Sequence, residues 1–196
     1  MEIDFVITWV DMNDSKWQQD FVKYSNKTEN EKNSISVARF RDYGLLKFWF
    51  RGVEKFAPWV RKIHFVTCGQ KPEWLDENHP KISHINHKDF IPNQFLPSYN
   101  SVVIERYLHK IPDLAEHFVY FNDDFYIINH LDKSRFFQNG LPCDISIFQY
   151  NPNWSQWYIR IKNNIKLINK YFNKKEVINN FYHKWFSPLY GKKLWM

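Results

Sequence analysis

Short apolar runs alternate with stretches of helical periodicity along most of the chain. Three runs are rich in β-branched and aromatic residues, as buried strands are, and they lie at residues 3–10, 62–67 and 117–121. A weaker strand is predicted at residues 82–86. Helices are predicted where apolar residues recur at spacings of three and four, at residues 45–56, 101–111 and 154–172. Two short helices are expected at residues 17–24 and 72–75, and a further strand at residues 145–148, from weaker patterns. This alternation predicts an α/β fold, Rossmann-like and three-layered, with a mostly parallel sheet.

One α/β core with a helical extension is the expected domain organisation. The chain has no internal repeat and no Gly- or Ser-rich linker, and 196 residues are enough to bury one sizeable core. We assign residues 1–150 to the core and residues 151–196 to a helical extension that ends in a basic, aromatic segment. The 154–172 helix is expected to cover a face of the sheet with an apolar stripe formed by Trp157, Ile161, Ile165, Ile168 and Phe172.

Composition narrows the class of partner. The net charge of +6 favours an anionic partner such as a nucleotide, a phosphorylated sugar or a lipid headgroup. Basic residues are dispersed along the chain and no nucleic-acid recognition motif is present, so nucleic acid is not an expected partner. Cys68 and Cys143 are too few for a disulfide framework or a zinc cluster. No secretory signal is recognised, and no run reaches the ~20 apolar residues of a transmembrane segment. We therefore expect a cytoplasmic protein, with membrane contact restricted to a peripheral one at the inner face.

Two adjacent carboxylates interrupt an apolar stretch at residues 118–128. Asp123 and Asp124 follow Phe-Val-Tyr-Phe-Asn and precede Phe-Tyr-Ile-Ile, so they lie at the end of a predicted strand. Carboxylates beside a core need a cation or a hydrogen-bond network to offset their burial. Mg²⁺ commonly takes one or two carboxylates together with phosphate oxygens of a substrate. One interpretation is therefore a metal–diphosphate site, and the other is a surface turn, in which Asn and Asp are common.

The expected parallel sheet would bring distant residues to one edge. Ligands of such sheets bind outside the carboxyl ends of the strands. Asp11, Gly69, His87 and the Asp123–Asp124 pair occupy those ends in this sequence. Their convergence favours the metal-site interpretation.

Phosphate groups would have to be bound by side chains and metal. The sequence has neither a Gly-x-Gly-x-x-Gly motif after a strand nor a Walker-type loop. Arg39 and Arg41 are the best candidates, since a guanidinium group matches phosphate oxygens bidentately. A solvated arginine pair before a helix is an equally open interpretation.

Two blocks of sequence carry a resemblance to a known family. The first is Ile-Asp-Phe-Val-Ile-Thr-Trp-Val-Asp-Met-Asn-Asp at residues 3–14. The second begins with Arg-Phe-Arg-Asp-Tyr-Gly-Leu-Leu-Lys at residues 39–47 and continues through Leu-Pro-Ser-Tyr-Asn-Ser at 96–101 to Phe-Val-Tyr-Phe-Asn-Asp-Asp at 118–124. They resemble the first and second conserved regions of the Stealth family, the sugar-phosphate transferases of bacterial capsule synthesis. The catalytic part of animal N-acetylglucosamine-1-phosphotransferase belongs to the same family. Minor departures from the family pattern are Met12, Tyr43 and Cys68.

The resemblance implies a specific reaction. A sugar-1-phosphate would pass from a nucleotide-sugar donor to a hydroxyl of an oligo- or polysaccharide acceptor, forming a phosphodiester in capsular or exopolysaccharide synthesis. A divalent metal, Mg²⁺ or Mn²⁺, would be held by Asp123 and Asp124, and these two residues with Asp11 form the implied catalytic set. The implied substrate-binding residues are Trp9, Arg39, Arg41, Asp42, Ser101 and Glu105.

Two alternatives stay open at this point. Residues 155–196 look like the variable stretch before the family's third conserved region, and the His-containing motif of that region and the fourth region are not in this sequence. An incomplete, catalytically inactive chain is therefore one alternative. A metal-dependent glycosyltransferase is the other, since it would use the same carboxylates and donor but break the sugar C–O bond.

Overall fold

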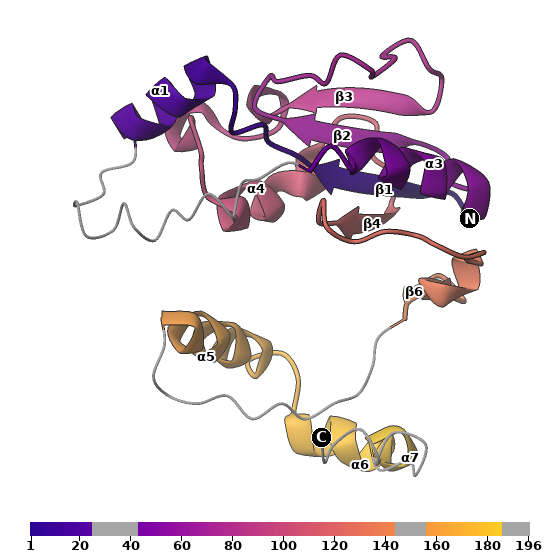
Figure 1. Cartoon of the computed structure of the whole chain (residues 1–196). Helices are drawn as coiled ribbons and strands as arrows, with labels where there is room; N and C mark the ends of the chain where they lie inside the picture. Colours follow the sequence, from indigo (N-terminus) through magenta and orange to yellow (C-terminus); the bar gives the residue numbers. More distant parts are fainter. Residues whose placement is uncertain (25–42, 144–155, 186–196) are drawn as a thin grey trace. The chain divides into compact units, whose positions relative to one another are not determined.

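The computed structural model of the chain describes residues 1–24, 43–143 and 156–185 (Figure 1). The chain divides into two compact units, Met1–Pro142 and Cys143–Met196. The strands are β1 (Ile3–Thr8), β2 (Ile63–Thr67), β3 (Ile82–Asn86), β4 (His117–Phe121), β5 (Phe137–Gln138) and β6 (Leu141–Pro142). The α-helices are α1 (Ser15–Tyr24), α3 (Leu46–Phe56), α4 (Ser101–Tyr107), α5 (Gln156–Ile168), α6 (Lys174–Asn180) and α7 (Tyr182–Trp185). Short 3-10 helices are η2 (His87–Asp89), η3 (Asn93–Phe95), η4 (Leu108–Lys110) and η5 (Lys133–Arg135).

Four parallel strands form the sheet of the first unit, in the order β3-β2-β1-β4 (Figure 1). β1 lies inside the sheet, where Phe5 is opposite Ile63 of β2 and Val119 of β4. The predicted α/β fold with a mostly parallel sheet is therefore confirmed. β1 ends at Thr8, two residues before the predicted end, and the chain then turns into the loop that precedes α1.

Helices lie on both faces of this sheet, which gives the expected three layers (Figure 1). Alternate residues of β1 face opposite sides, as the pleat of a strand requires. Phe5 and Ile7 join a core with α3, whose Trp49 is fully buried. Val6 joins the core on the other face, together with Leu108 at the end of α4. Each such aliphatic or Phe side chain contributes roughly 1.5–3 kcal/mol by leaving water.

Some smaller elements differ from the sequence-based expectations. Residues 72–75 form a turn rather than a helix, in which the Leu75 N–H donates to the Pro72 carbonyl at 3.1 Å. The helix expected over 101–111 is shorter, because α4 ends at Tyr107 and continues as η4. The β5–β6 hairpin was not predicted, although Asn139 and Gly140, with φ of 53° and 77°, form the Asn-Gly turn typical of tight hairpins. The strand expected at 145–148 lies outside the described residues.

The second unit is helical, as expected for the extension. α5 falls within the predicted range, and its stripe residues Ile161, Ile165 and Ile168 are 36%, 50% and 54% exposed. Within the described residues of this unit nothing covers the stripe, so its packing on the sheet stays a prediction. None of the helices in the described ranges is long and apolar enough to cross a membrane.

A buried charge network joins the amino ends of β1, β2 and β4. The carboxylate of Asp4 is fully buried; it accepts hydrogen bonds from Arg61 at 2.6 and 2.8 Å and from the Ala115 N–H at 2.8 Å, and it lies 2.9 Å from Nε2 of His64. Burial raises the pKa of Asp4, but the hydrogen bonds from Arg61, Ala115 and His64 outweigh burial and hold that pKa below its usual value. Burial lowers the pKa of His64, so its ring is neutral at pH 7. This network lies at the opposite end of the strands from the expected ligand edge, and we assign it to stability.

Candidate functional site

The carboxyl ends of the four strands form one edge of the sheet, and the loops after them supply the candidate site. Strand order reverses next to β1, because β2 and β3 extend to one side of it and β4 lies on the other. Ligands of open α/β sheets bind at such a reversal, outside the carboxyl ends of the strands. Residues 9–14 after β1 and residues 122–124 after β4 flank that position.

The reversal brings three of the predicted acidic residues around one phenol. The hydroxyl oxygen of Tyr120 in β4 lies 3.1 Å from Oγ1 of Thr8, at the end of β1. Burial raises the pKa of Tyr120, the hydrogen bond with Thr8 opposes this rise, and the negative charges of Glu105, Asp123 and Asp124 add to it. Glu105 of α4 and the Asp123–Asp124 turn therefore lie close enough to act on the same group. All three acidic residues are exposed.

Asp11 lies in a loop that Gln70 fastens to the end of β2. The Asp11 N–H donates to Oε1 of Gln70 at 2.9 Å, and Nε2 of Gln70 donates to the Asp11 carbonyl at 2.7 Å and to the Asp14 carboxylate at 3.1 Å. The Asp11 carboxylate itself accepts the Asn13 N–H at 2.8 Å. The hydrogen bond from Gln70 is the main cause that lowers the pKa of Asp14. The loops after β1 and β2 are thus held together at the edge of the sheet.

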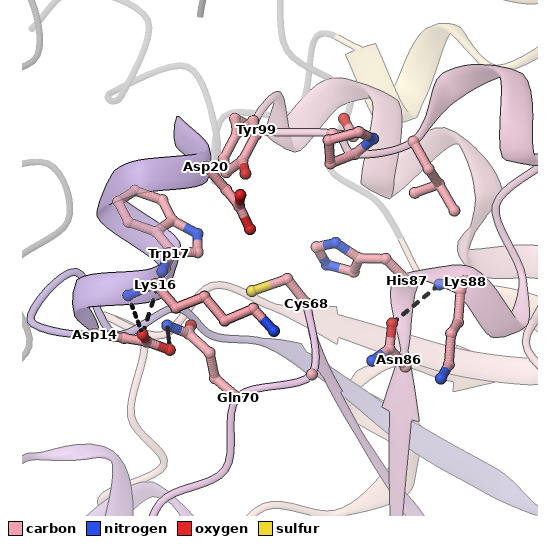
Figure 2. A pocket seen from close by; sticks show the side chains of 14 residues that line it. Asp14, Lys16, Trp17, Asp20, Cys68, Gln70, Asn86, His87, Lys88 and Tyr99 are labelled. Carbon is pink, nitrogen blue, oxygen red and sulfur yellow. Dashed lines mark hydrogen bonds between the residues drawn. The ribbon is translucent and has the colours of Figure 1, made fainter. Parts of the chain in front are cut away.

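A pocket of about 510 Å³ lies over the carboxyl ends of β2 and β3, next to α1 (Figure 2). Its walls come from α1, from the loops after β2 and β3, and from the segment before α4. Figure 2 shows the imidazole of His87 directed toward α1 and the thiol of Cys68 exposed to the same space. Trp17 and Tyr99 supply aromatic walls, with 5.6 Å between their ring centroids.

Three pocket groups carry no charge at neutral pH, and burial moves the pKa of each further away from neutral. Burial lowers the pKa of His87 to about 4 and raises the pKa of Tyr99 to about 12. Burial also raises the pKa of the Cys68 thiol, so this cysteine is not an activated nucleophile. Aromatic walls with a few hydrogen-bonding groups suit a small, flat, polar ligand. The charged side chains on the walls are Asp14, Lys16, Asp20 and Lys88.

The turn after β4 fits a divalent cation that takes part of its ligands from a substrate. No group of three or more His, Cys, Asp or Glu side chains able to hold a metal occurs among the residues that the structure describes. Those residues therefore do not form a metal cage of their own. One or two carboxylates are nevertheless the usual protein contribution where Mg²⁺ is shared with substrate phosphates. Asp123 and Asp124 meet that requirement, and the metal stays a prediction.

The other predicted site residues do not all lie at the carboxyl edge of the sheet. Trp9 is only 8% exposed, and its ring packs on Phe65 with 5.8 Å between centroids, so it belongs to the core of the first unit. Ser101 is the exposed first residue of α4, which is capped by the Asn100 side chain. The roles of Trp9 and Ser101 stay predictions. Three further predicted residues lie outside the described part of the chain, namely Arg39, Arg41 and Asp42.

The pocket walls were only partly predicted. Gly69 and His87 line the pocket, and the sequence had placed both at strand ends. Trp17 and Tyr99 were not identified as site residues, because each lies in a segment whose position depends on packing. Tyr99 directly follows Leu-Pro-Ser in the second motif block, and this was the available signal.

Comparison with known proteins adds a family to this geometry. Residues 39–144 match the sequence model of Stealth protein CR2, conserved region 2. The chain is 46% identical over 198 aligned residues to capsular polysaccharide phosphotransferase WcwK of Streptococcus pneumoniae, an alignment that covers 98% of this chain and 58% of that protein. It is 41% identical over 196 residues to receptor polysaccharide phosphotransferase WefC of Streptococcus oralis, an alignment that covers 98% of this chain and 58% of that protein. It is 38% identical over 193 residues to capsular polysaccharide phosphotransferase CpsJ of Streptococcus thermophilus, an alignment that covers 97% of this chain and 80% of that protein.

The parallel sheet, its reversal next to β1 and the pocket along its carboxyl edge define a Rossmann-like α/β protein with a candidate ligand site at that edge. The match over residues 39–144 and the relatives then identify the family: the chain belongs to the Stealth family. The resemblance found in the sequence is confirmed. The chain spans 58% of the length of the first two of these relatives.

Proposed function

We propose that the protein transfers a sugar-1-phosphate from a nucleotide-activated sugar to a hydroxyl of an oligo- or polysaccharide, in capsular or exopolysaccharide synthesis. The names of the relatives support this proposal, because all three are polysaccharide phosphotransferases. The observation that carries it is the acidic turn at the β1–β4 reversal, with the pocket on the same edge of the sheet. With a nucleotide-sugar donor, the reaction would take place in the cytoplasm.

The pocket would hold the nucleoside part of the donor. Its aromatic walls, Trp17 and Tyr99, offer rings against which a base can pack. The neutral imidazole of His87 can donate one hydrogen bond and accept another, which suits the polar edge of a base.

The diphosphate would lie toward the acidic turn. Asp123 and Asp124 would hold a Mg²⁺ or Mn²⁺ ion there, which would offset phosphate charge and act as a Lewis acid. Arg39 and Arg41, from the matched family region, would bind the remaining phosphate oxygens bidentately. Asp42, from the same region, would contact the donor.

The acceptor side of the reaction involves the remaining edge residues. The acceptor oxygen would form a bond to the phosphorus next to the sugar, and the bond from that phosphorus to the bridging oxygen would break, releasing a nucleoside monophosphate. Asp11, whose loop is fixed by Gln70, would take the proton of the acceptor hydroxyl. Ser101 and Glu105 on α4 would position the sugar.

The identity of the product tests this proposal. The full-length protein is incubated with a panel of UDP-, GDP- and CDP-activated sugars, an acceptor oligosaccharide and Mg²⁺, and the products are followed by ³¹P NMR. We expect a phosphodiester resonance coupled to protons of the acceptor sugar, with nucleoside monophosphate as the by-product. A phosphate-free glycoside with nucleoside diphosphate would contradict the proposal and select the glycosyltransferase alternative.

A further inference from the structure

The positive charge of the protein belongs almost entirely to its second unit. Residues 1–142 carry 18 Lys and Arg against 19 Asp and Glu, a net charge of −1, whereas residues 143–196 carry 9 against 2, a net charge of +7. The basic residues are spread over the whole chain, but in the first unit acidic residues balance them, so the net positive charge is concentrated in the second unit. An anionic partner of the second unit is therefore expected.

The same unit presents an apolar helix side. Ile161, Ile165 and Ile168 of α5 follow one another at spacings of four and three and are 36%, 50% and 54% exposed. Lys162 and Lys166 each directly follow a stripe residue, about 100° further round the helix axis, so they flank the stripe. The stripe continues into Phe172, which is 63% exposed. Residues 156–175 contain no acidic side chain.

We propose that α5 binds the surface of an anionic phospholipid membrane and lies parallel to it, in place of the packing on the sheet that its apolar stripe also predicts. A basic amphipathic helix of this kind places its apolar side at the boundary between headgroups and acyl chains, while lysines reach the headgroups. With 13 residues the helix is about 20 Å long, less than the ~30 Å hydrocarbon core, so it lies on the membrane rather than across it.

The apolar stripe favours a lipid surface over other polyanions. Nucleic acid or an acidic polysaccharide would be bound by the lysines alone and would leave Ile161, Ile165 and Ile168 in water. A membrane provides a partner for both kinds of side chain, because its acyl chains contact the isoleucines and its anionic headgroups contact the lysines. Exposed aromatic residues, Tyr171 and Tyr182, suit the interfacial region as well.

Vesicle co-sedimentation of the full chain tests the proposal. Vesicles are made of phosphatidylcholine alone or of phosphatidylcholine mixed with phosphatidylglycerol. We expect binding to the mixed vesicles that weakens as salt is added, and little binding to phosphatidylcholine alone. The triple variant Lys162→Gln, Lys166→Gln, Lys170→Gln should bind at least about tenfold more weakly, since each lysine near the surface adds to the attraction. The triple variant Ile161→Ser, Ile165→Ser, Ile168→Ser should lose binding to a similar degree.

A matched control removes equal charge from the first unit. The variant Lys47→Gln, Lys55→Gln, Lys110→Gln should bind the mixed vesicles as the unmodified chain does. Circular dichroism and thermal unfolding show whether each variant keeps its helices. Equal loss in the control, or unchanged binding by the isoleucine variant, overturns the proposal. If the isoleucine variant instead dissociates a dimer in analytical ultracentrifugation, the stripe binds a second copy and the proposal is wrong.

Discussion

His87 follows β3 and lines the pocket, yet the residue is only 9% exposed. Its ring lies edge-on to Phe90, with 6.3 Å between the centroids. Burial lowers its pKa to about 4, so the imidazole carries no charge at neutral pH. In the proposed function this uncharged imidazole would contact the nucleoside, while the phosphates would bind at the acidic turn.

The buried histidine predicts a specific loss of stability in acid. The unfolded chain takes up a proton on His87 near pH 6.5, whereas the folded chain does so only near pH 4, so stability falls as the pH drops through that window. At pH 5 this residue alone should cost about 2 kcal/mol relative to pH 7. We expect urea denaturation of His87→Gln to show a smaller difference between pH 7 and pH 5 than the unmodified chain. The exposed-residue control His109→Gln should keep the full difference, and an equal difference in all three proteins would contradict the burial argument.

At the residue scale, the sequence could name candidate site residues, but not show how they lie together. Asp123 and Asp124 were singled out from their type and their position after a strand, and Glu105 from the family resemblance. In the structure all three lie near one tyrosine, and their roles stay predictions. Trp17 and Tyr99 could not be assigned to a pocket, because their approach depends on how α1 and the segment before α4 pack. That packing is a property of the tertiary fold.

At the scale of elements, α3 lies unusually close to the segment that leads from the acidic turn. A Cβ atom at Gly52 would lie 2.6 Å from the backbone carbonyl oxygen of Ile127. Gly52 is itself buried, between Trp49 and Val53 on the core side of the helix. The absence of a side chain at this position allows the close contact.

Gly52→Ala should therefore destabilise the protein, although alanine is the better helix former by about 1 kcal/mol. The added methyl group must displace backbone, and we expect a net loss of about 1–3 kcal/mol in the free energy of unfolding, as for other overpacked sites. Chemical denaturation measures it. Glu54→Ala, at an exposed position of the same helix, should change stability by less than about 0.5 kcal/mol. A more stable Gly52→Ala protein would show that the contact is not tight.

Strands were easier to predict from sequence than the connections. The four predicted runs all form strands, since β-branched and aromatic residues fit a pleated sheet surface. β1 and β2 are almost fully buried inside the sheet, whereas β3 and β4 lie at its edges and are only partly buried. The β5–β6 hairpin was overlooked because its strands have only two residues each, too few for an alternating pattern. The turn at 72–75 has a proline suited to a helix start, but no helix follows it.

At the scale of the whole molecule, sequence predicted the class of fold but not its strand order. Alternating strands and helices imply parallel pairing, and the sheet is parallel. Nothing in the strand sequences specified that β4 would lie beside β1, on the side away from β2 and β3. That placement puts the acidic turn beside the Asp11 loop and forms the candidate site. The separation of charge between the units likewise emerged only when the units were defined.

The central claim is that the acidic turn binds a nucleotide sugar together with a divalent metal. Isothermal titration of the full chain with the UDP-, GDP- and CDP-sugar panel, in Mg²⁺ and then in EDTA, tests it directly. We predict binding of one donor class in Mg²⁺ that EDTA abolishes, and at least about tenfold weaker binding by Asp124→Asn, since even outer-shell changes at metal sites cost about 10–100-fold. Glu116→Gln, an exposed carboxylate before the amino end of β4, should bind as the unmodified protein does. Unchanged affinity in EDTA, or in Asp124→Asn with an unaltered thermal unfolding midpoint, would contradict the claim.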